Sequence, residues 1–177
     1  IILQDADLES AVQAGVAGMM LNTGQSCNAP SRMFVHKSQL ATVEKMTIDA
    51  LASVVVGDPL DPQTTMGPIA NQRQYLRVQS LIEDGIKQGA KLVAGGVGRP
   101  DGIETGFFVK PTIFSEATND MNIAREEIFG PVLTIIPYES EDEVIKMAND
   151  TEYGLSGYVS AGTTERAKEF ALQLRTG

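Results

Sequence analysis

Tryptophan is absent from this chain, and cysteine and histidine occur once each among its 177 residues. A single cysteine can form no internal disulfide, and one cysteine with one histidine cannot assemble a Cys/His zinc site. Two phosphate-binding patterns are missing as well: Gly-x-x-x-x-Gly-Lys, and a Gly-x-Gly-x-x-Gly that follows a strand. The sequence therefore predicts no metal site, and its cysteine usage fits a cytoplasmic location.

Positive charge is also scarce, because 14 lysines and arginines stand against 23 acidic residues, for a net charge of −9. No basic cluster interrupts this pattern, so we expect neither a nucleic acid nor an anionic membrane as a partner. No apolar run approaches the roughly 20 residues that a membrane helix needs. Small molecules or other proteins are the expected partners.

Amphipathic segments alternate with short apolar runs along the chain. Five helices are expected, each after a residue that commonly caps a helix N-terminus: Asp7, Ser38, Asn71, Ser140 and Thr163. Five extended segments are expected at residues 32–36, 91–94, 107–114, 131–136 and 155–160. Pro111 argues for an edge position or a break in the third of them. This alternation predicts an α/β fold with an open, mostly parallel sheet and helices on both faces.

Cys27 lies in the polar, glycine-containing run 22–28, directly after an apolar helical stretch. A structural cysteine is expected among apolar neighbours, whereas a reactive thiolate needs hydrogen-bond donors and room for a substrate. Backbone N–H groups of a tight turn can favour the thiolate and can also hold a developing oxyanion. Cys27 is therefore a candidate nucleophile for a carbonyl carbon, with an inert packing role as the alternative. His36 stands on an apolar strand, where packing is the better expectation.

The run Glu126–Pro131 places two carboxylates and an aromatic ring directly before an apolar strand. A carboxylate here could bind a ribose diol, and the ring of Phe129 could form a wall for a flat heterocycle. The alternative is a solvated acidic turn with Phe129 packed in the core.

These two runs together resemble segments of the aldehyde dehydrogenase superfamily. The nucleophile segment of that family, Asn-x-Gly-Gln-x-Cys followed after four residues by Arg, is matched by Asn22, Gly24, Gln25, Cys27 and Arg32. Its cofactor segment, Glu-Glu-Ile-Phe-Gly-Pro-Val, is present at residues 126–132. The resemblance implies a catalytic domain that uses NAD or NADP to oxidise an aldehyde to a carboxylic acid.

The resemblance also implies roles for individual residues. Cys27 would form a thiohemiacetal and then a thioester with the substrate. Glu127 matches the residue that hydrogen-bonds the nicotinamide ribose, and Phe129 the one that positions the ring. Gln74 matches a weaker ribose contact, with helix capping as the alternative. Ser26 and Asn28 flank the thiol at positions that vary with substrate, and are expected in the substrate pocket.

Chains of this family are much longer than 177 residues, although the resemblance covers essentially all of this one. We therefore expect residues 1–177 to be the thiol-bearing catalytic domain of a longer, homo-oligomeric protein. The general-base glutamate and the dinucleotide-binding domain would lie upstream, so the isolated chain is expected to show little or no turnover. Two alternatives stay open: a thioester hydrolase or acyl transferase that uses Cys27, and a non-catalytic fragment that serves as a structural or binding module.

Overall fold

The computed structural model describes residues 1–177 and contains one four-stranded sheet in the order β1-β4-β3-β2. The strands are β1 (Arg32–His36), β2 (Lys91–Ala94), β3 (Thr112–Ser115) and β4 (Val132–Tyr138). Both β1 and β3 pair with β4 in parallel, whereas β2 pairs with β3 antiparallel. The expected open and mostly parallel sheet is confirmed.

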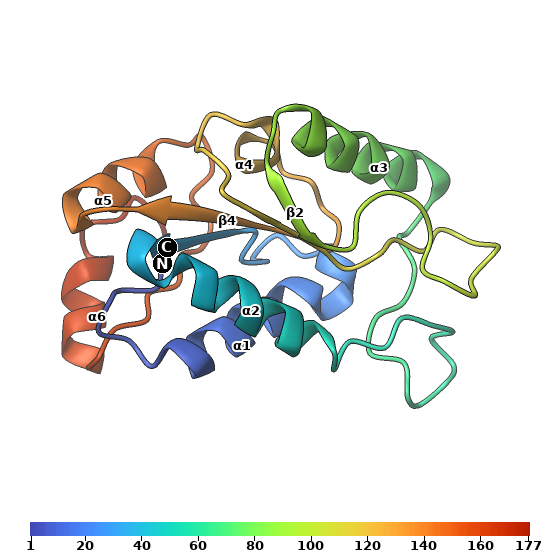
Figure 1. Cartoon of the computed structure of the whole chain (residues 1–177), viewed down its shortest axis with the longest axis horizontal. Coiled ribbons are helices and arrows are strands. Elements are labelled where there is room, and N and C mark those ends of the chain that lie inside the picture. The colour runs from blue at the N-terminus through green and yellow to red at the C-terminus, as the bar shows by residue number, and fades with distance from the viewer.

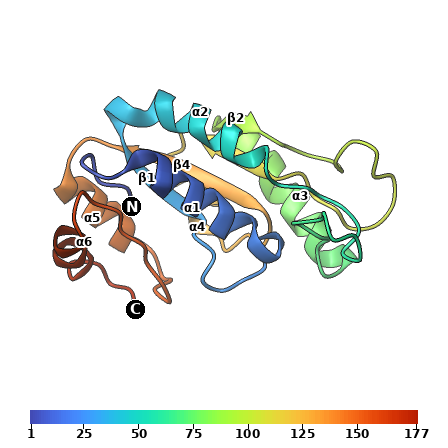
Figure 2. The ribbon, with the colours of Figure 1, turned by 90° about the horizontal axis from the view of Figure 1, so that it is seen from below.

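Helices cover both faces of the sheet (Figure 1). One face carries α1 (Leu8–Met20) and α2 (Leu40–Leu51). The opposite face carries α3 (Gln72–Lys87), α4 (Asn122–Arg125) and α5 (Glu141–Asn149). The last helix, α6 (Thr164–Ala171), lies beside α5 at one end of the molecule, as Figure 2 also shows. None of the helices has the length and apolar content needed to cross a membrane.

The central strand β4 is buried on both sides. Leu133 and Ile135 join the apolar side chains of α1 and α2, whereas Val132 and Ile136 join those of α3 to α6. This division follows from the two-residue period of a strand. Because β4 is enclosed in this way, the segment that enters it from Glu126 onward has a rigid anchor.

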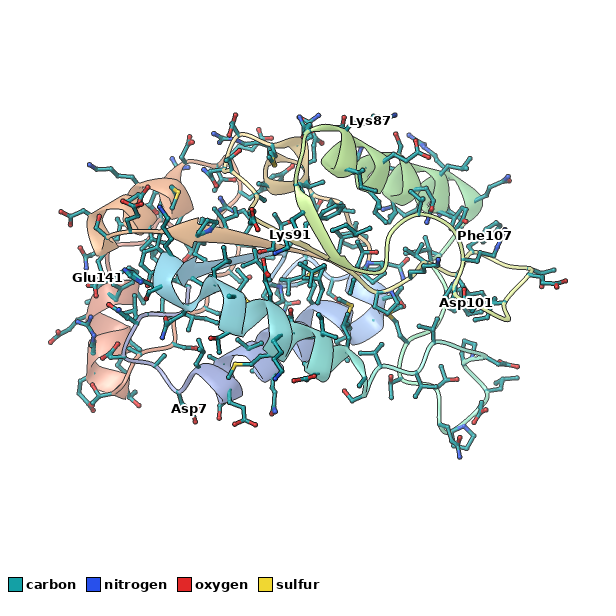
Figure 3. The ribbon with its side chains drawn as sticks, in the orientation of Figure 1. Asp7, Lys87, Lys91, Asp101, Phe107 and Glu141 are labelled. Atoms are coloured by element: carbon teal, nitrogen blue, oxygen red, sulfur yellow. The ribbon has the colours of Figure 1, made fainter.

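Four of the five expected helix caps are confirmed. One side-chain oxygen of each capping residue accepts a backbone N–H three residues on, at Asp7 (Figure 3), Asn71, Ser140 and Thr163. The expectation for Ser38 is wrong, because Ser38 lies inside a short 3₁₀ turn and its N–H donates to Nδ1 of His36. His36 is the capping residue there, and α2 begins only at Leu40.

Two strand expectations need correction. The stretch 107–114 is regular only from Thr112, because Pro111 breaks it, and β3 is an internal strand of the sheet. Residues 155–160 form no strand, and Ser160 alone makes a β-bridge, to Ile2. Gly157 offers this segment no side chain to pack. The segment instead borders the cavity described below.

Candidate active site

The loop that carries Cys27 begins with a left-handed turn. Asn22, Thr23 and Gly24 have φ values of 52°, 60° and 68° in succession. Residues with a Cβ rarely adopt this conformation, so the surrounding structure must hold the first two in place. The turn reverses the chain after α1 and delivers Cys27 to the end of the sheet at which β1 begins.

Side-chain hydrogen bonds hold this turn. Asn22 Nδ2 donates to the carbonyl oxygen of Gln25 at 2.9 Å, which closes the turn on itself. Thr23 Oγ1 donates to the Gly67 carbonyl at 3.0 Å, and Gln25 Oε1 accepts the N–H of Ala70 at 2.8 Å. The side chains of Thr23 and Gln25 therefore fix the loop against residues 67–70, whereas Asn22 closes the turn itself.

Cys27 itself is exposed, and it sits in a turn closed by a hydrogen bond from the Ala29 N–H to the Ser26 carbonyl at 3.0 Å. The backbone N–H groups of Ser26, Cys27 and Asn28 donate to no acceptor within the chain. An exposed thiol beside unused donors does not fit an apolar packing role.

The second loop, Glu126–Gly130, joins α4 to β4. Its core residue is Ile128, which is 3% exposed, whereas Phe129 is 37% exposed and has a φ of 54°. Arg77 forms an ion pair with Glu126 at 3.1 Å. The carboxylate of Glu127 has no ion-pair partner, so one of the two adjacent acids is left free for a ligand.

The two loops touch through their backbones. Because β1 and β4 are parallel neighbours, with Arg32 opposite Thr134, the segments that lead into them lie at the same end of the sheet. Gly24 of the first loop packs directly on Gly130 of the second, and a Cβ on Gly24 would overlap the carbonyl oxygen of Gly130.

Gln74, in the first turn of α3, contacts the loop Glu126–Gly130. Its backbone N–H is capped by Asn71, but its side chain does not complete the reciprocal cap. Gln74 Nε2 instead donates to the carbonyls of Ile128 at 2.8 Å and Phe129 at 3.0 Å. The alternative expectation, that the Gln74 side chain caps the helix, is therefore wrong.

A cavity of about 290 Å³ opens between the loops. Four of the residues expected at the site line it: Ser26, Cys27, Glu127 and Phe129. Gln74 and Asn28 are not part of its lining. The structure thus brings the thiol and the acidic, aromatic segment to one cavity, with Gln74 behind it.

Sequence reasoning missed two tyrosines that line the same cavity. Tyr158 Oη donates to the Asn28 carbonyl at 3.0 Å, next to the thiol. Tyr153 Oη accepts the N–H of Glu127 at 3.3 Å. Tyr158 lies in the segment 155–160 that was expected to be a strand, and Tyr153 lies two residues before it. The signal that could have placed them at a site is the pairing of tyrosines with glycines in residues 153–158.

Two arginines also reach the cavity wall, and both are engaged. Arg32 donates to Asn119 Oδ1 at 2.9 Å and to the Ala148 carbonyl at 3.2 Å, and burial lowers the pKa of its guanidinium. Arg125 pairs with Asp150, and this hydrogen bond holds the pKa of Asp150 below its usual range. No group of three His, Cys, Asp or Glu side chains is placed to hold a metal ion.

An exposed thiol, an acidic side chain and an aromatic ring thus line one cavity, at the end of the sheet where the parallel strands β1 and β4 begin. The chain belongs to the aldehyde dehydrogenase family, whose family model matches residues 1–177.

Among curated relatives, 3-succinoylsemialdehyde-pyridine dehydrogenase of a Pseudomonas species is 59% identical over 177 residues. Betaine aldehyde dehydrogenase of Brucella anthropi is 42% identical over 178 residues. Each match covers 100% of this chain and 37% of the relative, so the chain spans little more than a third of their length.

Solved structures of this family superimpose closely. Aldehyde dehydrogenase C of Pseudomonas syringae, crystallised as a cysteine-to-alanine mutant with NAD+ and octanal, gives a TM-score of 0.97 at 49% identity. The Mycobacterium tuberculosis aldehyde dehydrogenase with NAD+ gives 0.96 at 41%. Both matches cover 99% of this chain and 36% of the solved chain.

Proposed function

We propose that residues 1–177 are the catalytic domain of a longer NAD(P)-dependent aldehyde dehydrogenase, with Cys27 as its nucleophile. The observation that carries the proposal is the shared cavity: the exposed Cys27 thiol lies with unused N–H groups beside it, and Glu127 and Phe129 line the same space. Family membership supports it. We extend the proposal to a homo-oligomeric, cytoplasmic protein on the family resemblance and the lack of disulfides.

The residues of this chain suit attack on an aldehyde. The Cys27 sulfur would add to the carbonyl carbon and form a thiohemiacetal. The free N–H of Cys27 would donate to the developing oxyanion, which is stabilised more strongly in a cavity than in water. Loss of hydride from the thiohemiacetal carbon, for which a bound NAD or NADP would be the acceptor, would leave a thioester on Cys27. Hydrolysis by water would then release the carboxylic acid and return the free thiol. On the family resemblance, the base for that last step would lie upstream of residue 1.

The cavity residues fit a dinucleotide. The unpaired carboxylate of Glu127 can accept hydrogen bonds from a ribose diol, and the exposed ring of Phe129 can lie against a nicotinamide. Gln74 Oε1 accepts no hydrogen bond within the chain, so it can accept one from a ribose hydroxyl as well. NAD or NADP, when bound, supplies the hydride acceptor. Solved relatives that hold NAD+ support this assignment.

The aldehyde would approach past Ser26, which lines the cavity next to the thiol. Asn28 would help to form the substrate pocket through its backbone, because Tyr158 Oη donates to its carbonyl and fixes it beside the cavity. Both cavity arginines are already bonded within the chain, so no free guanidinium is offered to an anionic group on the substrate.

Replacement of Cys27 by alanine tests the proposal. In the full-length protein, Cys27→Ala should lower aldehyde-dependent NAD(P)H production by about a thousandfold or more, because the nucleophile is lost. Ser26→Ala is the matched control, since it changes a neighbouring cavity residue and keeps the thiol. Undiminished turnover in Cys27→Ala would refute the role of Cys27. Ester hydrolysis with no NAD(P)H production from any aldehyde would point instead to a hydrolase or acyl transferase.

A further inference from the structure

The backbone of Phe129 is strained and is held from outside its own loop. Phe129 has a φ of 54°, a region that residues with a Cβ seldom occupy. The carbonyl of Phe129 and that of the preceding Ile128 both accept hydrogen bonds from Gln74 Nε2, at 3.0 and 2.8 Å. A primary amide has two N–H groups, and here both are directed to this one turn.

The next residue, Gly130, is enclosed on two sides. A Cβ at Gly130 would lie 2.6 Å from a methyl group of Val78 on α3. On the other side, the Gly130 carbonyl packs on Gly24 of the cysteine loop. The position of Gly130 thus sets the distance between α3 and the loop that carries the thiol.

We infer that Gln74 is a positioning residue for both walls of the cavity. Its two N–H groups hold residues 128–130 in the conformation that presents the Phe129 ring. Through Gly130 and Gly24, the same two bonds fix the cysteine loop relative to that ring. This role rests on the proposed function, and it is separate from a ribose contact, which would use the side-chain oxygen.

The two roles separate at Gln74→Glu. A glutamate keeps an oxygen that can accept from a ribose hydroxyl, but it loses both donors and points a negative charge at two carbonyl oxygens. Loop positioning therefore fails in Gln74→Glu, while a ribose contact survives. Gln74→Met removes the donors and the acceptor together and adds no charge.

Gln72→Glu is the matched control. Gln72 lies in the same first turn of α3, is exposed, and makes no side-chain hydrogen bond. Both glutamates add a carboxylate at a helix N-terminus, where it is stabilising. Any difference between the two variants therefore reports the bonds to Ile128 and Phe129.

The experiment uses the full-length protein and two readouts. Hydrogen exchange without cofactor should show the hydrogen-bonded amides within residues 126–132 and 22–25 exchanging about tenfold faster in Gln74→Glu and Gln74→Met than in wild type. Calorimetry should show NAD+ binding about tenfold more weakly in both variants. Gln72→Glu should match wild type in both measurements.

Normal exchange in Gln74→Glu overturns the inference, and so does weak NAD+ binding confined to Gln74→Met, which would assign Gln74 to the ribose alone. The proposed function fails on a different result, namely a wild-type protein that makes no NAD(P)H from aldehydes. The exchange comparison decides the role of Gln74 in either case.

Discussion

Gly24 combines two requirements at one position. Its φ of 68° lies in the left-handed region, and its Cα faces the Gly130 carbonyl with no room for a side chain. The first requirement is common to many glycines of turns. The second is particular to the contact between the cysteine loop and the loop Glu126–Gly130.

Gly24→Ala is expected to destabilise the protein by about 3 kcal/mol, because backbone strain and steric overlap add. Gly102→Ala is the control, since Gly102 has a φ of 79° and nothing within 4 Å of its added Cβ. That variant should lose only about 1 kcal/mol. Urea unfolding measures both. Equal losses would show that the contact with Gly130 contributes nothing to stability.

For single residues, the sequence indicated which side chains are candidates for the site better than it indicated which contacts they make. Cys27, Glu127 and Phe129 could be chosen as candidates because the residues adjacent to each in the sequence already suggest its chemistry. The bonds from Gln74 to the carbonyls of Ile128 and Phe129 cannot be read in the same way, because they join segments that only the fold brings together.

Among the helices, α2 is tied to the edge of the sheet by a partly buried ion pair. Glu44 on α2 accepts from Lys91 on β2 at 2.8 Å, and Lys91 (Figure 3) also reaches Glu116 at 3.1 Å. Burial by itself would raise the pKa of Glu44. Hydrogen bonding by Lys91 and Ser115, together with the charge of Lys91, outweighs burial and holds this pKa below its usual value.

Glu44→Gln is expected to lower the free energy of unfolding by about 1 kcal/mol at neutral pH. A lowered folded-state pKa contributes stability above the unfolded-state pKa and loses it as pH falls through the folded value. The difference in unfolding free energy between Glu44→Gln and wild type should therefore be constant near neutral pH. It should shrink once the pH falls below 4.5, the ordinary pKa of a glutamate carboxyl.

Glu83→Gln is the control for this prediction, because the Glu83 carboxylate is 3.8 Å from Lys87 and is 55% exposed. It should change stability by no more than about 0.3 kcal/mol. Denaturant unfolding between pH 3 and 8 follows both variants. A Glu44→Gln difference that grows toward acid pH would contradict the direction of the pKa shift.

Helix starts were predictable because a capping residue and its N–H partner are three residues apart. The strand at 155–160 was wrong because its apolar pattern has no partner beyond Ser160. The antiparallel direction of β2 could not be predicted either, because it depends on the path of the long connection between Ala94 and Thr112.

For the molecule as a whole, two apolar clusters lie on opposite faces of one sheet, and the chain spans 37% of the length of its curated relatives. Side chains beside the cavity stay open to solvent: Leu155 is 61% and Tyr158 is 52% exposed. The cavity is therefore open to water on the side of Leu155 and Tyr158.

The isolated 177-residue chain is accordingly expected to oxidise aldehydes no faster than its own Cys27→Ala variant. Under the proposed function, the base and most of the dinucleotide site would come from residues outside this chain. The rates of aldehyde oxidation by the two proteins are measured from NAD(P)H absorbance with a panel of aldehydes. Efficient oxidation by the isolated chain would contradict the expectation and place a complete active site within these residues.

The pairing of β1 with β4 also orders events during synthesis. Arg32 aligns with Thr134, so Cys27 leaves the ribosome well before Glu127 and Phe129, which line the same cavity, are made. Residues 67–70 reach the cysteine loop next, and Gly130 reaches it later. Long-range pairing of this kind forms late in folding. The nascent chain therefore carries its thiol before the cavity beside it has formed, and the thiol is open to oxidation at that stage as well as in the folded chain.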